Sequence, residues 1–433
     1  MKSNITEEQA QSALDLTAEI IDEFGPRLTG TPACKKAGVR LKTELEKSCT
    51  QTFSEKFQCS RDAFLYFIRY FSISYLGAFI CLITSGAWTI LAAVLTFFGC
   101  IMAVCEFVFY KEFIDPLFKK TDGYNISGTI EPTAEIQQSI IISGHYDSPH
   151  VFRFLNKNQK LYKLRVIITT GLYFLITAIS LWASYQWITQ PGSFEINKEL
   201  IYILGFGLIF MLQYFFFVSW DVSPGAGDNL ISSAIAIKLA DHFSIQNLTH
   251  TLLVFLCPDA EESGLRGARE YVKLHRETLQ SIPTYNINMD SIYRLQDLRY
   301  LKSEINGTVP LDKNIIRKCA EISKSLGYNI PKIRMPFGGG STDAAEFAKA
   351  GIPALSIIGL DTTFTSGNVP YHTQFDTVDQ IEPEAVLACM QIAEQFILDI
   401  DKLQLVESDN SIKLKYNLLD EYEKELFNFK FHI

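Results

Sequence analysis

Two adjacent glutamates, Glu261 and Glu262, follow the apolar run TLLVFLC in the stretch PDAEESGLRG (258–267). An apolar run of this length is typical of a buried strand, so both carboxylates are expected where that strand leaves the core. Because side chains of neighbouring residues diverge, the two carboxylates are expected to point in different directions at this strand end. The ordinary alternative is a pair of solvated acids at the start of a helix, where they favour the helix dipole.

Histidines and further acids occur at similar places in the chain. Two apolar runs lead into His145 with Asp147 and into Asp290, Asp228 lies in GAGDN at an expected helix start, and Tyr371 and His372 follow a loop. Each residue alone is more often a helix cap, a turn former or a surface residue. Together, two histidines and several carboxylates are the ligand set of a divalent metal pair such as zinc, and no thiolate is needed.

The elements that must position these residues alternate between strand and helix patterns. Strands are expected in 51–58, 139–147, 250–259 and 284–292, and helices in 5–23, 33–48, 234–243, 264–275, 313–326 and 384–400. Such alternation predicts an α/β fold with a mixed, mostly parallel sheet and helices on both faces. In such a sheet the functional site lies beyond the carboxyl ends of the strands, where the histidines and acids are found.

Two long apolar segments interrupt this pattern. Residues 71–110 carry a single charge, Glu106, and residues 166–187 and 200–220 carry none. Since about 20 apolar residues cross a bilayer, these segments predict two transmembrane helical hairpins with four spans. Buried core helices are the alternative. Glu106 lies near a span end, so a solvated position at the interface is expected for it.

Charge bias predicts which side of the membrane the remaining chain occupies. Two hairpins leave all other segments on one side, and that side carries ten lysines and arginines near the span ends, whereas the link between the last two spans has only Lys198. The positive-inside rule therefore places the large domain in the cytoplasm. The N-terminus lacks a signal-peptide core, and nine cysteines without a CxxC pair suit a reducing compartment.

The balance of charge excludes one class of partner. A formal net charge of -9 gives no uniform basic field, and no basic and aromatic motif is present, so no nucleic-acid partner is expected. Hydrophobic residues make up 48% of the chain, which suits contact with a lipid bilayer. Nothing in the residues indicates an oligomeric state. The tail 411–433 is amphipathic enough for a packing or interface helix.

Six stretches in order resemble metallopeptidase family 28, the co-catalytic zinc aminopeptidases. They are GPRLTGTPACKKA (25–37), GHYDS (144–148), GAGDN (225–229), EESGLRGA (261–268), NMDS (288–291) and YHTQFDTVD (371–379). The resemblance implies the zinc aminopeptidase fold and two zinc ions. It divides the chain into catalytic-domain parts 1–63, 119–163 and 221–433 and inserted hairpins 64–118 and 164–220.

The same resemblance implies a role for each site residue. His145 and Asp290 are the terminal ligands of one zinc ion, Glu262 and His372 those of the other, and Asp228 bridges both. Asp147 orients a ligand, Glu261 is the general base, and the Tyr371 hydroxyl helps to stabilise the oxyanion. The segment FGGGSTDAAEF (337–347) departs from relatives, which often have Ser-Asp-His where this chain has Asp343 followed by Ala344. Asp343 is therefore left outside the catalytic set.

The implied function is a membrane-anchored, zinc-dependent aminopeptidase that hydrolyses N-terminal peptide bonds. Because one hairpin separates two of the implied ligands, His145 and Asp228, peptide substrates associated with the membrane are expected. One alternative is a glutaminyl cyclase-like acyltransferase, which typically has Trp where this chain has Tyr371. The other is a receptor or scaffold of the same fold without catalysis, although such proteins generally lose metal ligands that are retained here.

Overall fold

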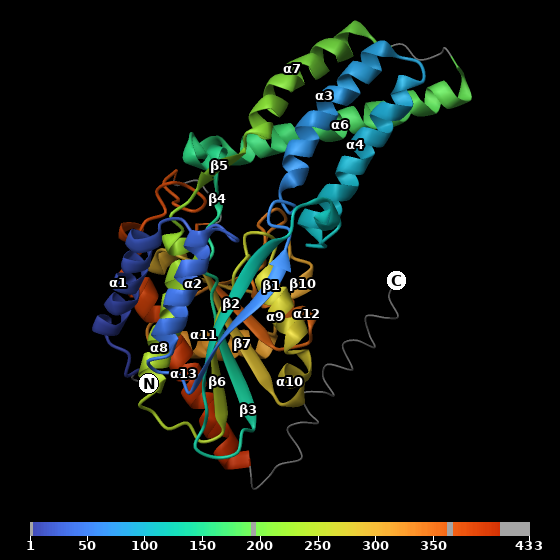
Figure 1. The fold of residues 1–433 in the computed structure, drawn as a ribbon. Coiled ribbons are helices and arrows are strands. Elements are labelled where there is room, and N and C mark those ends of the chain that lie inside the picture. The colour runs from blue at the N-terminus through green and yellow to red at the C-terminus, as the bar shows by residue number, and fades with distance from the viewer. Residues whose placement is uncertain (1–2, 192–195, 362–366, 408–433) are drawn as a thin grey trace.

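The computed structural model describes residues 3–191, 196–361 and 367–407 of the chain. Its centre is an eight-stranded sheet (Figure 1). In order across the sheet, the strands are β1 (Gln51–Cys59), β2 (Thr121–Ile130), β6 (Thr251–Cys257), β3 (Gln138–Ser143), β7 (Thr284–Ile292), β12 (Ala354–Gly359), β8 (Arg299–Leu301) and β11 (Lys332–Ile333).

The strand directions make the sheet mixed. The four central strands β6, β3, β7 and β12 are parallel to one another, and β11 is parallel to β8. The pairs β1–β2, β2–β6 and β12–β8 are antiparallel. The predicted mixed, mostly parallel sheet is therefore confirmed. Two smaller ribbons pair β4 (His150–Phe152) with β5 (Val218–Val222) and β9 (Ser303–Glu304) with β10 (Val309–Pro310).

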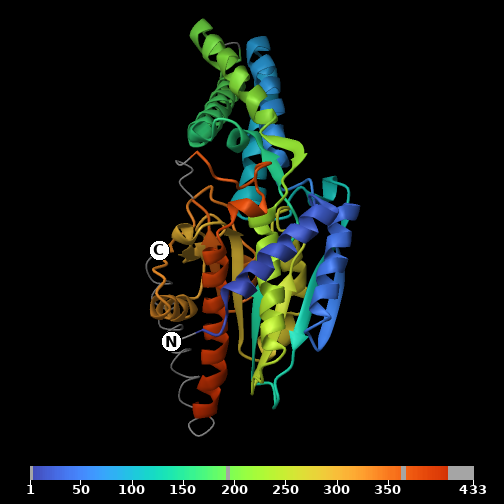
Figure 2. The same cartoon turned by 90° about the vertical axis from the view of Figure 1, so that its left-hand side faces the viewer.

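Helices cover both faces of the sheet (Figure 2). Helices α8 and α13 lie against one face with α1 outside them, and α9 and α12 lie against the other. The helices of this domain are α1 (Glu7–Phe24), α2 (Pro32–Leu45), α5 (Arg153–Asn156), α8 (Ile231–Phe243), α9 (Arg266–Leu274), α10 (Arg276–Ser281), α11 (Lys313–Ser325), α12 (Ala344–Lys349) and α13 (Pro383–Glu407). Short 3-10 helices span Asp115–Leu117, Gln159–Leu161, Leu295–Asp297 and Val378–Gln380, and π-helical turns span Val104–Val108 and Ala226–Leu230.

Capping residues explain where several helices begin. The Thr6 hydroxyl accepts from the Gln9 amide while the Gln9 side chain accepts from the Thr6 amide, which is a capping box at α1. Thr31 caps α2, whose first residue is Pro32, and the Asp312 side chain caps α11. All six predicted helices in this domain are confirmed by the structure.

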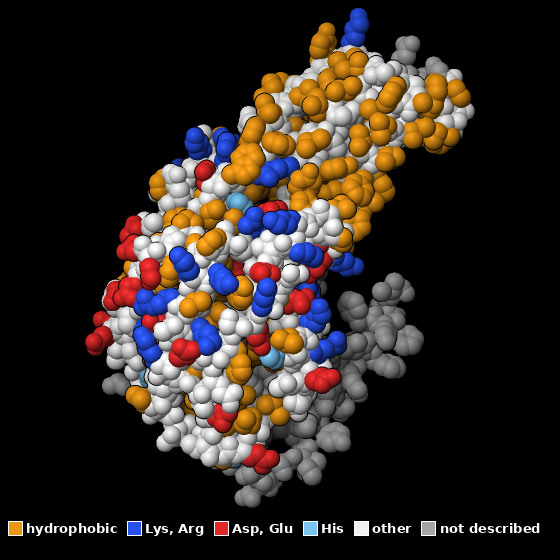
Figure 3. Space-filling model, in the orientation of Figure 1, with side chains coloured by type: hydrophobic (Ala, Val, Ile, Leu, Met, Phe, Trp, Pro, Cys, Tyr) orange, Lys and Arg blue, Asp and Glu red, His pale blue; other side chains and the backbone are white. Residues whose placement is uncertain are grey.

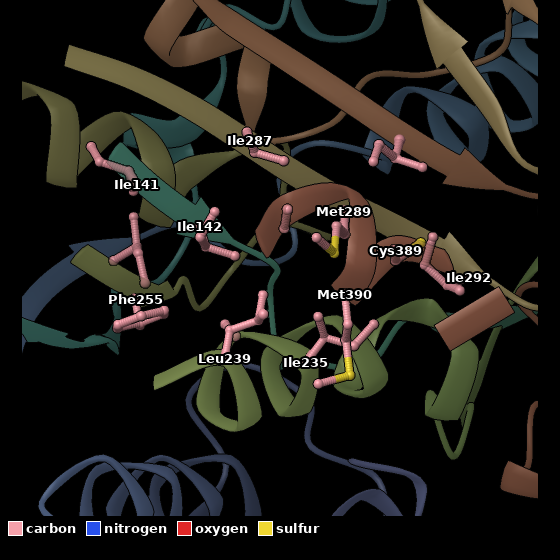
Figure 4. Packing of buried hydrophobic residues seen from close by; sticks show 14 of the residues in the cluster. Ile141, Ile142, Ile235, Leu239, Phe255, Ile287, Met289, Ile292, Cys389 and Met390 are labelled. Atoms are coloured by element: carbon pink, nitrogen blue, oxygen red, sulfur yellow. The ribbon is translucent and has the colours of Figure 1, made fainter. Parts of the chain in front are cut away.

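The core lies between the central strands and the helices α8 and α13 (Figure 4). Ile142 from β3, Phe255 from β6 and Ile287 from β7 are fully buried and face this layer together with Leu239 of α8 and Met390 of α13. Burial on both faces explains why these strands read as continuous apolar runs rather than as alternating ones. A rigid core of this kind fixes the strand ends that carry the histidines and acids.

Four long apolar helices project from one end of the sheet as a separate bundle (Figure 1). They are α3 (Tyr66–Thr84), α4 (Trp88–Ala103), α6 (Tyr162–Thr189) and α7 (Lys198–Phe215). Each is long and apolar enough to cross a membrane, α4 when it is taken together with the π-helical turn that ends at Val108. The two hairpins pack on each other: Phe71 stacks on Tyr173 with ring centroids 3.7 Å apart, and the Tyr75 hydroxyl donates to the carbonyl of Leu204 at 3.0 Å. Polar contacts of this kind between apolar helices are typical of membrane bundles.

Each hairpin is inserted between two paired strands. The register of β1 and β2 places Cys59 opposite Thr121. The first hairpin, which consists of α3 and α4, is therefore inserted at the place where a tight turn could join those two strands. Helices α6 and α7 are inserted in the same way between β4 and β5. Because Ile126 in β2 is paired with Cys257 at the end of β6, the first hairpin leaves from the edge at which the parallel strands end.

The surface of the bundle differs from that of the sheet domain (Figure 3). Large apolar side chains such as Val94, Ile167 and Phe206 are each about 60% exposed, whereas charged side chains cover the sheet domain. An apolar surface this extensive is rare on a protein that is in contact with water only. The four helices are candidate membrane spans on the basis of their length and composition alone.

Two sequence expectations for the hairpins are wrong. Helix α7 ends at Phe215, and the predicted last part of the second hairpin, from Val218 to Trp220, belongs to β5. Glu106 is completely buried and forms an ion pair with Arg266, so it is not solvated. The amphipathic tail at 411–433 lies outside the described residues.

Candidate metal centre and active site

The histidines and acids singled out in the sequence converge at the carboxyl end of the parallel strands. His145 lies two residues beyond β3, Glu261 and Glu262 follow β6, and Asp290 lies within β7. Because β6, β3 and β7 are adjacent and parallel, their ends meet at one edge of the sheet. His372 comes from the loop before α13.

Asp228 lies between the two histidines. Its Oδ1 is 3.7 Å from Nε2 of His145, and its Oδ2 is 3.3 Å from Nε2 of His372. Glu262 Oε2 is 3.4 Å from the same nitrogen of His372, and Asp290 Oδ2 is 3.8 Å from Nε2 of His145. The two oxygens of Asp228 thus face two separate groups of donors, as a bridging carboxylate requires.

These separations fit zinc. Two ligand atoms bonded tetrahedrally to zinc at about 2.0–2.2 Å lie about 3.3–3.6 Å from each other. The contacts of His372 with Asp228 and Glu262 fall in that range, and those around His145 are slightly wider. The donors are imidazole nitrogens and carboxylate oxygens, which zinc binds.

The charge of the cluster also calls for cations. Asp147, Asp228, Glu261, Glu262 and Asp290 are all at most about one-eighth exposed at the side chain, and among the described residues their ion-pair partners are histidines only. Glu262 Oε1 and Asp228 Oδ2 are buried without a hydrogen-bond donor in the described part of the chain. Buried carboxylates without donors are costly, and divalent cations remove that cost.

Burial changes the protonation of the cluster when no cation is bound. Burial raises the pKa of Asp290 to about 7, and the neighbouring Asp228 adds to this while His145 opposes it. Burial lowers the pKa of His372 to about 4, so its imidazole stays neutral and keeps a lone pair for a metal. Burial also raises the pKa of Glu262 well above its ordinary value, with Asp228 and Glu261 adding to the shift.

Asp147 organises both His145 and the loop after β6. Its Oδ1 is 3.2 Å from Nδ1 of His145 and 3.1 Å from the amide nitrogen of Glu261, and its Oδ2 accepts from the amide of Glu262 at 3.3 Å. A carboxylate on Nδ1 leaves Nε2 of the imidazole free to bind a metal and fixes the direction of the ring. One buried side chain thus sets the relative position of three site residues.

Glu261 and Tyr371 border the ligand cluster. Glu261 Oε2 is 3.7 Å from Nε2 of His145, which is as close as Asp228 and Asp290 come to that nitrogen. The ring of Tyr371 lies 4.1 Å from the His372 ring between centroids, and burial together with Asp228 and Glu262 raises the pKa of its hydroxyl. The structure therefore brings all eight residues singled out in the sequence to one place.

Two buried groups that are not proposed ligands, Arg27 and Asp376, hold the loops of the site in place. The buried guanidinium of Arg27 donates to the carbonyls of Tyr146, Pro224 and Gly225 at 2.7–2.9 Å, so it joins the loop after His145 to the turn before Asp228. Asp376 accepts from the amides of Gly227 and Asp228, at 2.8 and 3.2 Å, and holds the bridging carboxylate in place.

Glycine is required at two of these turns. Gly225 has a φ of +64°, a backbone conformation that a side chain disfavours. A Cβ on Gly144 would lie 2.3 Å from Cβ of Ser232, because the loop after β3 crosses the start of α8 at close range. The backbone angle accounts for Gly225 in GAGDN, and the close contact accounts for Gly144 in GHYDS.

Sequence reasoning missed one acid of the site. Asp343, which was excluded because Ala344 follows it, is completely buried, and neither of its oxygens has a hydrogen-bond donor among the described residues. Burial raises its pKa well above the ordinary value; His145 opposes the shift and Asp290 adds to it. The only signal in the sequence was the preceding run of glycines, which does not distinguish a site loop from a plain turn.

Comparisons with known proteins agree with this fold and chemistry. The sequence model of peptidase family M28 matches residues 217–397. A comparison with curated proteins found no match.

Solved structures share the fold at low identity. A Zn-dependent exopeptidase from Parabacteroides distasonis is 14% identical with a TM-score of 0.54, covering 90% of this chain and 97% of that one. A glutaminyl cyclase from Porphyromonas gingivalis is 12% identical with a TM-score of 0.56, covering 92% and 99%. A leucine aminopeptidase precursor from Bacteroides thetaiotaomicron is 14% identical with a TM-score of 0.53, covering 92% and 99%. Residues 217–397 thus match peptidase family M28, and the described chain has the fold of zinc exopeptidases and glutaminyl cyclases.

Proposed function

We propose that this chain is a zinc-dependent exopeptidase, an aminopeptidase, that hydrolyses N-terminal peptide bonds. The observation that carries the proposal is the position of Asp228, whose two oxygens face Nε2 of His145 and Nε2 of His372 at 3.7 and 3.3 Å. The family match over 217–397 and the fold shared with a Zn-dependent exopeptidase support the same class of chemistry.

Five residues would hold two zinc ions. His145 and Asp290 would bind one ion, Glu262 and His372 the other, and Asp228 both, in agreement with the distances among their donor atoms. When bound, the ions would polarise the scissile carbonyl and make the attacking water more acidic. Asp147 would hold His145 in the tautomer that presents Nε2.

Glu261 is the proposed general base. Its side chain is 11% exposed, so it can meet a substrate, and its amide is fixed by Asp147. Burial raises its pKa well above the ordinary value; His145 opposes this shift and Asp290 adds to it. A carboxyl group with a raised pKa can take a proton from water and return it to the departing amine nitrogen. The Tyr371 hydroxyl would donate to the oxyanion.

The test compares Glu261→Gln with wild-type protein purified in detergent. We expect about two zinc ions per chain in both, and a fall in aminoacyl-anilide hydrolysis of at least about a hundredfold in the variant. Glu270→Gln on α9, outside the site, is the matched control and should keep wild-type turnover. Full activity in Glu261→Gln would refute the assignment of the base.

A cyclase is the second candidate, because the structures that share the fold include glutaminyl cyclases. A peptide that begins with glutamine separates the two functions. A peptidase releases free glutamine, whereas a cyclase forms a pyroglutamyl peptide and releases ammonia. A scaffold without catalysis would bind no stoichiometric zinc and would give neither product.

We also propose that the two hairpins anchor the catalytic domain in a lipid bilayer with that domain in the cytoplasm. Under this proposal, residues 64–118 and 164–220 form the membrane part, and 1–63, 119–163 and 221–433 form the catalytic domain. A C-terminal tag that is cleaved by protease added outside intact cells would refute this orientation. Substrates would be membrane-associated peptides, so a lipid-anchored peptide should be cleaved faster than its soluble form; equal rates would argue against that substrate class.

A further inference from the structure

The segment that returns from the first hairpin packs on the loops that border the proposed active site. After α4 the chain forms the π-helical turn Val104–Val108 and reaches Tyr110, which has a φ of +52°. A bulky residue rarely adopts this left-handed conformation, and π-helical turns and strained residues both cluster at functional sites. Arg269 Nη2 donates to the Tyr110 carbonyl at 2.7 Å and holds the backbone in place.

The ring of Tyr110 packs on the loop that carries the two glutamates. It is 5% exposed and belongs to a small apolar cluster with Phe64, Leu265, Ile305 and Ala345, and its centroid is 4.7 Å from that of Phe64. Leu265 lies three residues after Glu262 in the same loop. The ring is therefore fixed by the loop itself, and its direction does not depend on a substrate.

The hydroxyl of Tyr110 lies beside the glycine-rich loop. A Cβ built on Gly340 would be 3.5 Å from the Tyr110 oxygen. Asn306 ties this loop to the hairpin, because its Nδ2 donates to the Phe107 carbonyl at 2.7 Å while its Oδ1 accepts from the Gly338 amide at 2.9 Å. Hairpin and loop thus form one connected border of the site.

Burial and the acids of the site keep this hydroxyl protonated. Burial raises the pKa of Tyr110 well above its ordinary value, and Glu261, Glu304, Glu262 and Asp290 add to the shift, in that order. The phenol therefore stays protonated and can donate a hydrogen bond. The carboxylate of Glu304 already accepts hydrogen bonds from the hydroxyls of Ser341, Thr342 and Ser356.

The two tyrosines border different parts of the site. Tyr110 packs on Leu265, whose amide donates to the carbonyl of Glu261 at 2.8 Å, whereas the ring of Tyr371 lies 4.1 Å from that of His372. Under the proposed function Glu261 returns its proton to the departing amine, so Tyr110 lies on the side of the leaving group. The nearest acceptor that a peptide presents there is the backbone carbonyl of the first residue after the cleaved bond.

We propose that Tyr110, supplied by the first apolar hairpin, contacts the substrate and donates a hydrogen bond to the peptide carbonyl on the leaving-group side of the scissile bond. This inference rests on the proposed peptidase function. It makes the hairpin part of the substrate-binding surface as well as an anchor, and it predicts a preference for peptides over substrates whose leaving group has no carbonyl.

The experiment compares Tyr110→Phe with wild-type on two substrates, a tripeptide and an aminoacyl-anilide that has the same first residue but no carbonyl in its leaving group. Loss of one neutral hydrogen bond should raise KM for the tripeptide roughly three- to tenfold and leave kinetics on the anilide unchanged. Tyr70→Phe is the control, because its hydroxyl donates to the Leu95 carbonyl within the same hairpin.

Zinc content and melting temperature of each variant show whether the site is intact. A Tyr110→Phe protein with wild-type kinetics on both substrates would overturn the proposal, and so would an equal loss on both. The proposed function is tested separately by the wild-type protein, because absence of hydrolysis of both substrates by wild-type would refute the peptidase and not the position of Tyr110. In that case the affinity of each protein for the tripeptide, measured by calorimetry, tests the hydrogen bond: a threefold or larger loss in Tyr110→Phe supports it, and equal affinity overturns it.

Discussion

Nη2 of Arg266 lies 2.8 Å from Oδ1 of Asp115, and both side chains are almost completely buried. Arg266 follows Glu262 by four residues, whereas Asp115 belongs to the segment that returns from the first hairpin. Glu106, in the π-helical turn after α4, is a second partner of the same guanidinium at 3.4 Å. A buried arginine thus joins the loop of the two glutamates to the first apolar hairpin.

Replacement of Arg266 by methionine should strongly destabilise the protein. The change leaves two buried carboxylates without their cation, and loss of one partner of a buried pair typically costs about 3–5 kcal/mol. We expect a large fall in the melting temperature in detergent. Lys273→Met is the control on the same helix, because its pair with Glu270 is exposed and should contribute less than about 1 kcal/mol. Equal melting of the two variants would contradict the role of Arg266.

Asp228→Asn should lower the zinc content below one ion per chain. The neutral amide has almost the same shape as the carboxylate. It has only one oxygen and no charge, so it cannot bind two cations at once. Elemental analysis of protein dialysed against dilute zinc measures the effect. Asp241→Asn, at the far end of α8, should retain about two ions. Retention of two ions by Asp228→Asn would mean that this residue does not bridge.

Removal of zinc should lower the melting temperature, because the buried carboxylates then lose their cations. A ligand that binds only the folded state stabilises it by about 2.7 kcal/mol at one hundred times its dissociation constant. The expected result is a fall of several degrees after treatment with a chelator and recovery after addition of zinc. A melting temperature that is insensitive to the chelator in wild-type protein would indicate that the cluster holds no structural metal.

Glu304 should make stability depend on pH. Burial raises its pKa from 4.5 to about 7, although hydrogen bonds from Ser356 and Thr342 oppose the shift. The folded protein therefore binds the proton more tightly than the unfolded chain. The stability from this group is fully present below pH 4.5 and is lost as the pH rises toward 7, by up to about 3 kcal/mol.

The measurement is the free energy of unfolding of wild-type protein relative to Glu304→Gln across that range. As the pH rises from 4.5 to 7, wild-type protein should lose stability relative to Glu304→Gln, because the amide of the variant stays neutral throughout. Glu270→Gln, a substitution of the same kind at the surface of α9, corrects for general effects of pH. A constant difference between wild-type and Glu304→Gln would show that the pKa of Glu304 is the same in the folded protein as in the unfolded chain.

Local patterns in the sequence predicted most of the fold. Apolar runs followed by His145, Glu261 and Asp290 identified three parallel strands and the edge at which they meet, because burial on both faces demands an uninterrupted apolar run. The helices and the two apolar hairpins followed from periodicity and length. The number of bound zinc ions, the role of each residue and the side of the membrane stay predictions.

Contacts between distant segments could not be predicted. Glu106 pairs with Arg266, which is 160 residues away, so its burial has no local signal. The uncharged run 200–220 does not show where helix gives way to strand, since Val218 and Trp220 are as apolar as the residues before them. Tyr110 and Asp343 join the site only because the first hairpin and the glycine-rich loop meet beside Gly340.

The first hairpin leaves the sheet domain from the edge at which the proposed catalytic residues lie. If the hairpins anchor the protein in a bilayer as proposed, the protein therefore fixes the distance between the lipid surface and the active site. An extended chain spans about 3.3 Å per residue, and a substrate that is itself embedded in the bilayer must bridge the gap with the residues between its anchor and its free end. A substrate with too few residues between its anchor and its free end cannot reach the metal cluster. Selection among membrane substrates can therefore depend on the length of the protruding segment, independently of the side chains that it carries.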